Sequence, residues 1–301
     1  MKETLEDIGM DSAVRTGSRS WLVYAMITTV FWGVWGALIE LPEKAGFPAT
    51  LGYCVWALTM LIPAFFALRS NDWKLDTDRK AIINGLVIGL LGCVGQILLF
   101  HVLMIGPAYL VFPIISLSPL LTILMSYILL KERASARAWT GIILALIAIP
   151  LLSYQSPQNE SHGSAWIWLS LLVFVAWGAQ AYFMKTANGF MQTASIFFYM
   201  TISAIAIIPV ALAMTDFKQD INWGLSGPYL ATLIQLLNAI GALFLVYAFR
   251  YGKAIIVSPM TNAGAPMITI ILSLIIYATI PHPAIIGGML LAIVAIFLMA
   301  E

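Results

Sequence analysis

The stretch GPAYLVFPIISLSPLLT, residues 106–122, is apolar enough to cross a membrane but carries two internal prolines, Pro113 and Pro119. Proline removes a backbone donor and clashes with the preceding turn, so a helix here is expected to kink or break. The stretch GKAIIVSPMTNAGAPMIT, residues 252–269, repeats the glycine, both prolines (Pro259 and Pro266), a polar residue between them and the threonine, with one residue inserted. Interrupted apolar segments at matching positions of two halves indicate the binding site of a transporter.

The composition predicts a protein embedded in a membrane. Of the 301 residues, 61% are hydrophobic and 10% are charged, whereas a soluble domain carries about 25% charged residues. The net charge of +1 gives no indication of a nucleic-acid partner. Cys54 and Cys93 both fall inside apolar runs, so no disulfide framework is indicated. Residues 1–20 are polar and lack the apolar core of a signal peptide, and we expect them to form a cytoplasmic tail.

A membrane-spanning helix needs roughly 20 mostly apolar residues. By this criterion the expected fold is an all-α polytopic membrane protein with ten transmembrane helices. The expected spans are 21–41, 48–68, 81–104, 107–130, 137–154, 164–186, 192–214, 228–249, 253–277 and 283–300.

Lysine and arginine are concentrated in alternate loops, which predicts the orientation of these spans. Of the 15 basic residues, all but Lys44 and Lys218 lie in the N-terminal tail or at the connections after the even-numbered spans. Cytoplasmic loops carry such an excess of positive charge. We therefore expect both termini to be cytoplasmic, and the protein to lie in the cytoplasmic (inner) membrane.

The two halves of the chain share further short matches. Trp32-Gly33 corresponds to Trp177-Gly178, and GIILALIAI at 141–149 corresponds to GMLLAIVAI at 288–296. Residues 21–154 and 164–300 are therefore expected to be two repeats. Because each repeat would hold five spans, an odd number, the second must lie inverted relative to the first. Such inverted repeats are typical of transporters that work by alternating access.

These features resemble the EamA-like branch of the drug/metabolite transporter (DMT) superfamily. The resemblance covers residues 21–300 and rests on Phe31-Trp32-Gly33, the Gly-Pro-Ala at 106–108, the Lys-Glu-Arg at 131–133 and the glycine of the fifth span. It implies secondary transport or exchange of small metabolites, with a central cavity lined by spans one, three, four, six, eight and nine. The second half departs from this pattern, because it has Tyr-Ala-Thr at 277–279 in place of a Lys-Glu pair. The two gates are therefore expected to be unequal.

Two tryptophans are candidates for holding a substrate. Trp32 and Trp35 share a helical face on the first span, and Trp177 and Gln180 repeat this spacing on the sixth. Trp32 and Trp177 are expected to face each other near the membrane midplane, where indole faces attract ammonium groups or sandwich a ring. Ordinary packing, or anchoring at the membrane interface, is the alternative.

Other polar residues lie on spans that the resemblance places at the cavity. Ser116 and Asn262 are repeat equivalents beside the second proline, where they either line the cavity or bond the backbone freed by the break. Cavity lining is favoured for Asn262. Gln235 and Asn238 share a face, and either bind substrate or hold helices together. The remaining candidates for substrate binding are Gln96, Tyr109 and Ser258.

Three ionisable residues are candidates for proton coupling or for gating. Glu40 and Lys185 occupy equivalent positions at opposite membrane faces. Glu40 is a candidate to act as a gate, exchange a proton or bind a cation, or else it is an ordinary loop residue. Snorkelling to the interface is favoured for Lys185. His101 is the one histidine within an expected span, and a core role is favoured over proton transfer.

A carrier fits these residues better than an enzyme or a channel. An intramembrane hydrolase is disfavoured because no serine elbow, metal cluster or phosphate loop accompanies His101, and neither a cofactor nor a metal is expected. A channel would need a pore-lining ring of repeated polar groups.

The sequence thus favours a secondary transporter for a neutral, zwitterionic or monocationic metabolite. Amino acids and amines come first, and sugars or nucleosides follow. A flippase for a lipid or a lipid-linked sugar is the main alternative. The expected partners are the substrate, membrane lipids and protons as the candidate coupling ion. Spans five and ten, rich in small residues, are the candidate surface for a homodimer.

Overall fold

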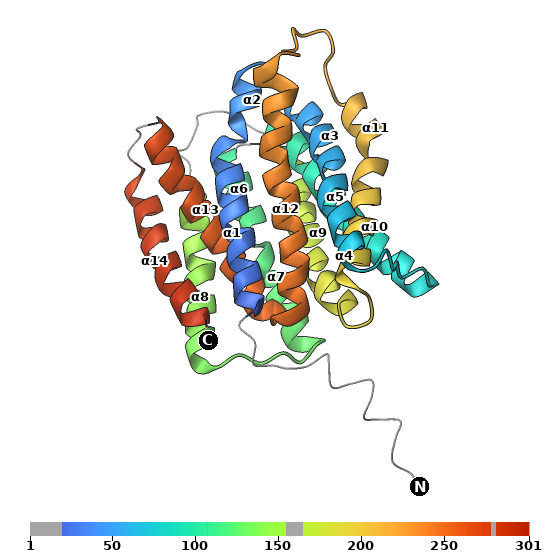
Figure 1. Cartoon of the computed structure of the whole chain (residues 1–301). Coiled ribbons are helices and arrows are strands. Elements are labelled where there is room, and N and C mark those ends of the chain that lie inside the picture. The colour runs from blue at the N-terminus through green and yellow to red at the C-terminus, as the bar shows by residue number, and fades with distance from the viewer. Residues whose placement is uncertain (1–19, 107, 155–164, 278–280, 301) are drawn as a thin grey trace.

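The computed structural model describes residues 20–106, 108–154, 165–277 and 281–300. Within these ranges, nothing is described of the side chains of 103, 104, 108–110, 113, 273, 276 and 277. The described residues form helices and no strand, arranged as one bundle of long, tilted rods (Figure 1).

The first half of the chain holds eight helical segments. They are α1 (Ser20–Leu38), α2 (Glu40–Lys44), α3 (Ala49–Thr59), α4 (Leu61–Ser70), α5 (Arg79–Ile105), α6 (Ala108–Ser116), α7 (Ser118–Ile128) and α8 (Ala136–Leu152). The second half begins with α9 (Ala165–Ala187), α10 (Thr193–Ala206) and α11 (Ile208–Ala213). It continues with a π-helical turn (Leu225–Tyr229), α12 (Leu230–Tyr251), α13 (Ala254–Tyr277) and α14 (Pro283–Met299).

Seven helical runs in the described residues are long and apolar enough to cross a membrane. These runs are Ser20–Lys44, Ala49–Ser70, Arg79–Val102, Ala165–Ala187, Thr193–Ala213, Leu225–Tyr251 and Ala254–Leu272. Three shorter apolar helices are Ile114–Ile128, Ala136–Leu152 and Pro283–Met299. The chain is therefore an integral membrane protein. Whether all ten apolar segments cross the membrane stays a prediction.

Two spans are interrupted at equivalent positions, and neither interruption was predicted from the sequence. Helix α3 gives way to α4 at Met60, and α10 gives way to α11 at Ile207. Each interruption lies just before a proline, Pro63 or Pro209, and these two prolines occupy matching places in the two halves. A proline ring clashes with the carbonyl four residues earlier, so the helix yields in the turn that precedes it.

The two proline-rich stretches behave differently from each other. The first is divided at Leu117 into α6 and α7, with Pro119 in the first turn of α7. In the second, α13 runs as one helix through Pro259 and Pro266, so no break occurs there. Side chains hold the turn between these prolines, because Thr261 donates to the carbonyls of residues 257 and 258, and Asn262 also donates to residue 258. These bonds reinforce the turn of α13 that lies between the two prolines.

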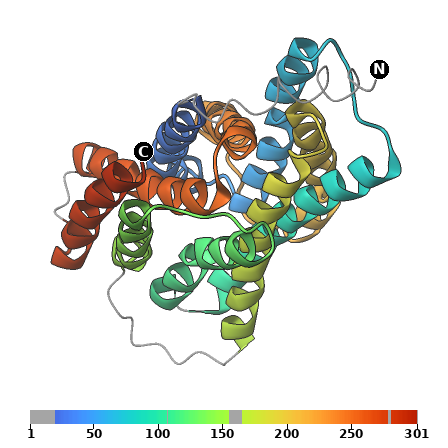
Figure 2. The same ribbon diagram turned by 90° about the horizontal axis from the view of Figure 1, so that it is seen from below.

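The halves of the chain exchange partners rather than packing separately. Helix α1 of the first half packs against α12 and α13 of the second, whereas α9 of the second packs against α5 and α7 of the first. Figure 2 shows α1 beside α12 at one side of the bundle and α9 beside α5 at another. The two arrangements correspond helix for helix under the sequence repeat.

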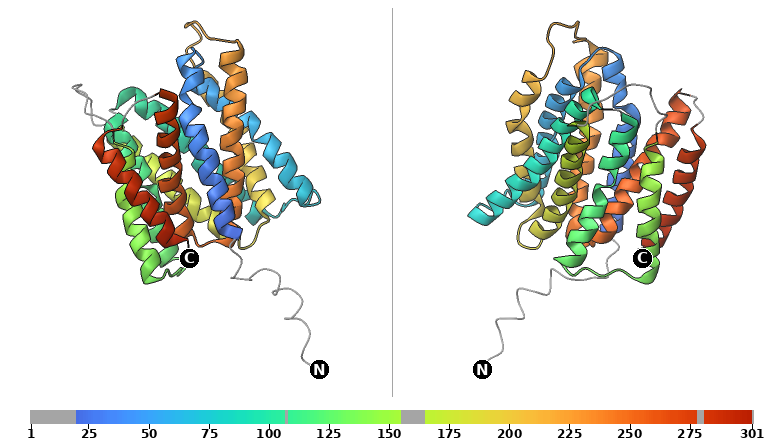
Figure 3. Two further views of the ribbon diagram at one scale, coloured as in Figure 1. Left: turned by 60° about the vertical axis from the view of Figure 1, so that its left-hand side comes forward. Right: turned by 180° about the vertical axis from the view of Figure 1, so that it is seen from behind.

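Helices α8 and α14 form an antiparallel pair at the edge of the bundle (Figure 3). A Cβ atom at Gly141, near the start of α8, would lie 2.8 Å from the side chain of Met299 at the end of α14. At the other end of the pair, a Cβ at Gly288 would lie 2.9 Å from Leu151. These glycines serve packing within the chain, and a homodimer through these helices stays a prediction.

Candidate functional site

Trp32 lies where α1 crosses α12. Its indole Nε1 donates to the carbonyl oxygen of Asn238, at 3.3 Å. The ring rests on Gly241, where an added Cβ would come within 2.5 Å of the indole Cδ1. Only glycine gives the indole this close approach to the α12 backbone. We call this arrangement the first tryptophan contact.

Trp177 makes the same contact between α9 and α5. Its Nε1 donates to the carbonyl oxygen of Gly92, at 3.4 Å, and a Cβ at Gly95 would lie 2.5 Å from that nitrogen. Under the sequence repeat, Gly92 corresponds to Asn238, and Gly95 corresponds to Gly241. We call this the second tryptophan contact. The structure thus builds one arrangement twice, from residues that correspond under the repeat.

The two indoles occupy separate places in the described structure. Trp32 packs with the large hydrophobic core, whereas Trp177 packs with a smaller cluster around Val111 and Trp166. No ring contact between Trp32 and Trp177 is found in the part of the chain that the structure describes. Both indole N–H groups are taken by backbone, which leaves ring surface as what each tryptophan offers a ligand. A ligand-holding role for the pair stays a prediction.

The neighbours of the two contacts differ in polarity. Trp35 Nε1 donates to Gln235 Oε1 at 3.0 Å, and the Gln235 amide donates to the carbonyl of Gly52 at 3.2 Å. Gln235 is 6% exposed and joins α12 to α1 and α3 through these bonds. Holding helices together was the alternative to substrate binding for this residue. In the described structure the half-buried amides of Gln96, Gln180 and Asn238 have no hydrogen-bond partner.

The polar residues of the proline-rich stretches bond mainly to the protein itself. Ser116 Oγ lies 2.9 Å from Ser153 Oγ of α8. The Asn262 amide donates to the Ser258 carbonyl at 2.9 Å, so part of its capacity stabilises α13. Ser258 is buried on the same helix. The side chains of Tyr109 and Pro113 lie outside the described residues.

Lys185, at the end of α9, is bonded inside the protein. Its Nζ donates to the carbonyls of Phe249, at 3.0 Å, and Gly252, at 2.7 Å. These carbonyls end α12, where the helix dipole favours a cation. Its side chain is 22% exposed and lies 3.9 Å from Glu132, which is 10% exposed. The Lys185 charge is therefore stabilised by protein groups, and snorkelling to the interface, the interpretation favoured from sequence, stays a prediction.

Glu132 was noted in the sequence only as part of the Lys-Glu-Arg resemblance. Its second oxygen accepts a hydrogen bond from the backbone N–H of Ile255, in the first turn of α13. A carboxylate at a helix N-terminus is favoured by the free N–H groups there. Glu132 and Lys185 thus join α9 and the end of the α7 segment to the turn between α12 and α13. The Lys-Glu-Arg sequence marks Glu132, but no local pattern in the sequence indicates these distant partners.

Further polar contacts gather at the same end of the bundle. Arg250 donates to the carbonyl of Met191, at 3.0 Å, and Asn188 donates to the carbonyl of Val246, at 3.0 Å. The Asp76 carboxylate accepts from the backbone N–H of Gln192, at 2.7 Å. Together with Glu132 and Lys185 these residues form what we call the α9-end network.

Glu40 has quite different surroundings at the opposite end. It is 61% exposed and pairs with Lys44, one turn later in α2, at 2.6 Å. The nearest interloop bonds there come from Asn222, which donates to the carbonyls of Ala45 and Gly46. His101 is exposed on α5. Residue 279, the repeat counterpart of Glu132, lies outside the described residues, and in the described part the two ends are unequal.

The EamA-like transporter family matches residues 19–154 and, separately, residues 164–300. The chain belongs to the EamA-like transporter family. The resemblance to the DMT superfamily is thereby confirmed, and with it the assignment as a membrane transporter.

Two relatives and one solved structure resemble this EamA-like transporter. An uncharacterized protein of Methanocaldococcus jannaschii is 35% identical over 77 residues, which are 26% of this chain and 56% of that protein. Protein LicB of Haemophilus influenzae is 25% identical over 211 residues, 66% of this chain and 70% of LicB. A crystal structure superimposes with a TM-score of 0.72 at 16% identity, covering 92% of this chain and 96% of the other, which supports the fold alone.

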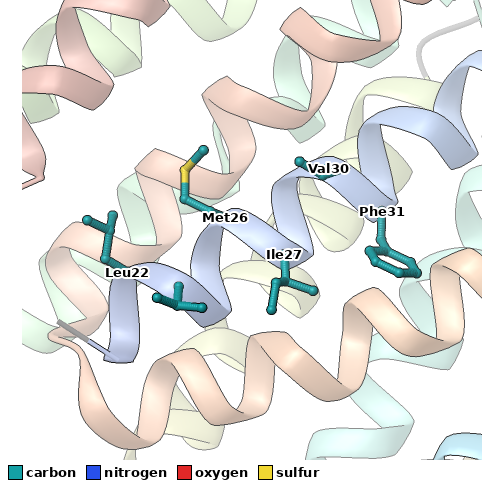
Figure 4. A pocket seen from close by; sticks show the side chains of 6 residues that line it. Leu22, Met26, Ile27, Val30 and Phe31 are labelled. Carbon is teal, nitrogen blue, oxygen red and sulfur yellow. The ribbon is translucent and has the colours of Figure 1, made fainter. Parts of the chain in front are cut away.

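The EamA-like transporter has a shallow depression of about 460 Å³ over α1 (Figure 4). Its lining residues are Leu22, Val23, Met26, Ile27, Val30 and Phe31. All six are apolar and belong to one helix, so the depression offers no polar group to a hydrophilic solute. It does not coincide with the central cavity that the resemblance implies, and that cavity stays an expectation.

Proposed function

We propose that this EamA-like transporter is a secondary carrier for a small organic metabolite, working by alternating access in the cytoplasmic membrane. The observation that carries the proposal is the duplication of the tryptophan contact. Two equivalent contacts, one in each half, suit a mechanism in which the halves exchange conformations around one site.

The proposed topology has ten spans in two inverted repeats, with both termini in the cytoplasm. The antiparallel pair α8 and α14 supports it, because two equivalent helices of inverted repeats must run in opposite directions. The exchanged packing of α1 and α9 supports it as well. In Figure 1, α1 begins and α14 ends at the lower end of the bundle. Residues of the basic connections meet there, since Lys253 donates to the Arg133 carbonyl at 2.7 Å.

The proposed substrate is neutral, zwitterionic or monocationic, with amino acids and amines as the first candidates. Indole faces attract cations and stack on planar groups. The amides of Gln96, Gln180 and Asn238 have hydrogen-bonding capacity left for a solute. Lys185 is bonded to two carbonyls and to Glu132 at one end of the bundle. The tryptophan contacts therefore contain no free cation, in the described residues, that would favour a dianionic substrate.

The α9-end network is proposed as the closed cytoplasmic gate in this conformation. Opening that side would separate the α9 end from the turn between α12 and α13, and so would break the bonds of Lys185. Glu40 is the corresponding candidate at the other end. Its exposed position suits a gate that is open in this conformation.

The test is transport by purified protein in liposomes. Substrate-induced currents on a solid-supported membrane would be measured for amino acids, amines, sugars and nucleosides, with and without an inward proton gradient. A saturable current from one amino acid or amine is the expected result. Dependence on the gradient would identify protons as the coupling ion.

Counterflow of labelled compounds complements the current, because electroneutral exchange generates none. Saturable uptake of a sugar or nucleoside would overturn the proposed substrate class and keep the carrier. Silence in both assays, together with scrambling of a fluorescent lipid, would overturn the carrier in favour of a flippase.

A further inference from the structure

Thr269 of α13 bonds to α1 at the residue that follows Trp32. Its hydroxyl donates to the carbonyl oxygen of Gly33, at 2.9 Å. In a helix that carbonyl is also the acceptor for the N–H group four residues later. The threonine therefore adds a second donor, from another helix, to a carbonyl of α1.

Thr122 of α7 makes the same bond in the other half. Its buried hydroxyl donates to the carbonyl oxygen of Gly178, at 3.0 Å, and Gly178 follows Trp177. Thr122 and Thr269 are the final residues of the two proline-rich stretches, and they correspond under the repeat. Neither was proposed as a site residue from the sequence, where the two threonines mark the ends of the repeated stretches.

The helices approach closely at both bonds. A Cβ at Gly33 would lie 2.5 Å from the Cβ of Ile268, and a Cβ at Gly178 would lie 2.7 Å from the Cβ of Leu121. Ile268 and Leu121 immediately precede the two threonines. Both halves thus contain a glycine carbonyl, a threonine hydroxyl and a bulky aliphatic neighbour in the same arrangement. They do so although the first proline-rich stretch is divided into α6 and α7, whereas α13 is one continuous helix.

Each tryptophan consequently lies at a junction of three helices. Its indole is bonded to α12 or α5, and the peptide that follows it is bonded to α13 or α7. Without the threonine bond, α1 or α9 would be free to turn or slide against the proline-rich helix while the indole N–H stayed on its other partner. The depth and rotation of the indole therefore depend on a group remote from the ring.

We propose that Thr122 and Thr269 are positioning residues that fix the orientation of Trp177 and Trp32, respectively. The functional meaning rests on the proposed function, in which these tryptophans contact the substrate. The positions themselves are testable without any substrate. Each threonine is assigned to one tryptophan only.

The experiment is ¹⁹F NMR of the full-length protein labelled with 5-fluorotryptophan, in nanodiscs. Trp32→Phe and Trp177→Phe assign the two resonances. Thr269→Val is expected to shift or broaden the Trp32 resonance and leave that of Trp177 unchanged, and Thr122→Val to do the reverse. Thr269→Ser and Thr122→Ser, which keep the hydroxyl, are expected to restore the wild-type positions. Alanine replaces valine at either site if the valine variant does not fold.

Thr261→Val is the matched control, because Thr261 is a fully buried threonine of α13 that bonds only within its own helix. It is expected to leave both resonances in place. The proposal is overturned if Thr269→Val leaves Trp32 unchanged, if each valine variant moves both tryptophans alike, or if serine fails to restore them. Because no substrate is used, a result of the transport and scrambling assays that overturns the proposed function would leave this result standing.

Discussion

Trp32 joins two helices through one edge of its side chain and leaves its ring face free for other contacts. Its N–H joins α1 to α12, which stabilises the bundle, while its ring remains half-buried. Packing and substrate contact are therefore not exclusive for this residue. Measuring the transport and the stability of the same variant distinguishes the packing role from the substrate-contacting role.

Trp32→Ala is expected to abolish transport while the protein still folds. The change removes the ring face that the proposed substrate stacks on, together with one indole hydrogen bond. Initial uptake rate in liposomes and melting temperature in detergent are the two measurements. Trp168→Ala is the control, since Trp168 is 70% exposed on α9, and it should preserve transport. Normal uptake by Trp32→Ala would contradict a substrate-contacting role.

Gly241→Ala is expected to destabilise the protein by about 1–3 kcal/mol, the usual cost of overpacking. The new Cβ would lie 2.5 Å from the Trp32 ring, so either the ring or α12 must move. Chemical denaturation in detergent measures the change. Gly287→Ala serves as the control, because a Cβ there meets nothing within 4 Å. Equal stability of the two variants would argue against the close Trp32 contact.

For single residues, the sequence predicted which tryptophans correspond in the two halves, but not which groups accept their hydrogen bonds. The Trp-Gly repeat identified Trp32 and Trp177, yet their acceptors are backbone carbonyls on helices that no motif marks. The role of Glu132 was missed for a similar reason. Its partners, Lys185 and the Ile255 N–H, are distant along the chain, and a salt bridge of that kind has no local signature.

Among the elements, the two proline-rich stretches differ by one residue, and this explains why only one of them breaks. Pro113 and Pro119 are six residues apart, whereas Pro259 and Pro266 are seven apart. Seven residues make nearly two turns, so both prolines of α13 lie on one face, while six residues leave the second proline about 120° away. The shorter stretch ends one helix at Leu117 and starts another. Sequence predicted an interruption in both.

Lys185→Met is expected to destabilise the protein by about 1–3 kcal/mol, because it leaves two helix-end carbonyls without their donor and a mostly buried carboxylate without its opposite charge. Glu132→Gln should have a smaller effect, and the double variant should cost less than the sum of the two. Thermal unfolding in detergent provides the cycle. Lys74 and Asp72 form the control pair, also 3.9 Å apart but 78% and 85% exposed, and should show no coupling. Strict additivity for Lys185 and Glu132 would contradict the network.

For the molecule as a whole, the composition and the criterion of roughly 20 apolar residues per span predicted where the helices lie. This works because the hydrophobicity of a segment can be read from that segment alone. Interruptions at Met60 and Ile207 were missed, although Pro63 and Pro209 could have marked them. The exchanged packing of α1 and α9 was beyond the sequence, because it depends on contacts between residues from 56 to 236 positions apart.

The orientation of the whole molecule is expected to follow the basic residues. In a chain with Cys54 and Cys93 replaced by alanine, Lys218→Cys should react with a membrane-impermeant maleimide added to intact cells. Lys74→Cys should react only after the membrane is opened, because it lies in the basic connection between α4 and α5. Reaction of Lys74→Cys in intact cells would reverse the proposed topology.

Because helices of the two halves pack against each other, the order of synthesis determines when each helix can reach its native partners. Trp32 and the carbonyl that accepts its N–H are 206 residues apart. A ribosome adds about 5–20 residues per second, so α1 waits roughly 10–40 s for α12 to be synthesised. During that delay the indole N–H and the Thr28 hydroxyl lack these acceptors, since the acceptor of Thr28 is the carbonyl oxygen of Gly241. Helix α1 is thus synthesised long before its native partners in α12.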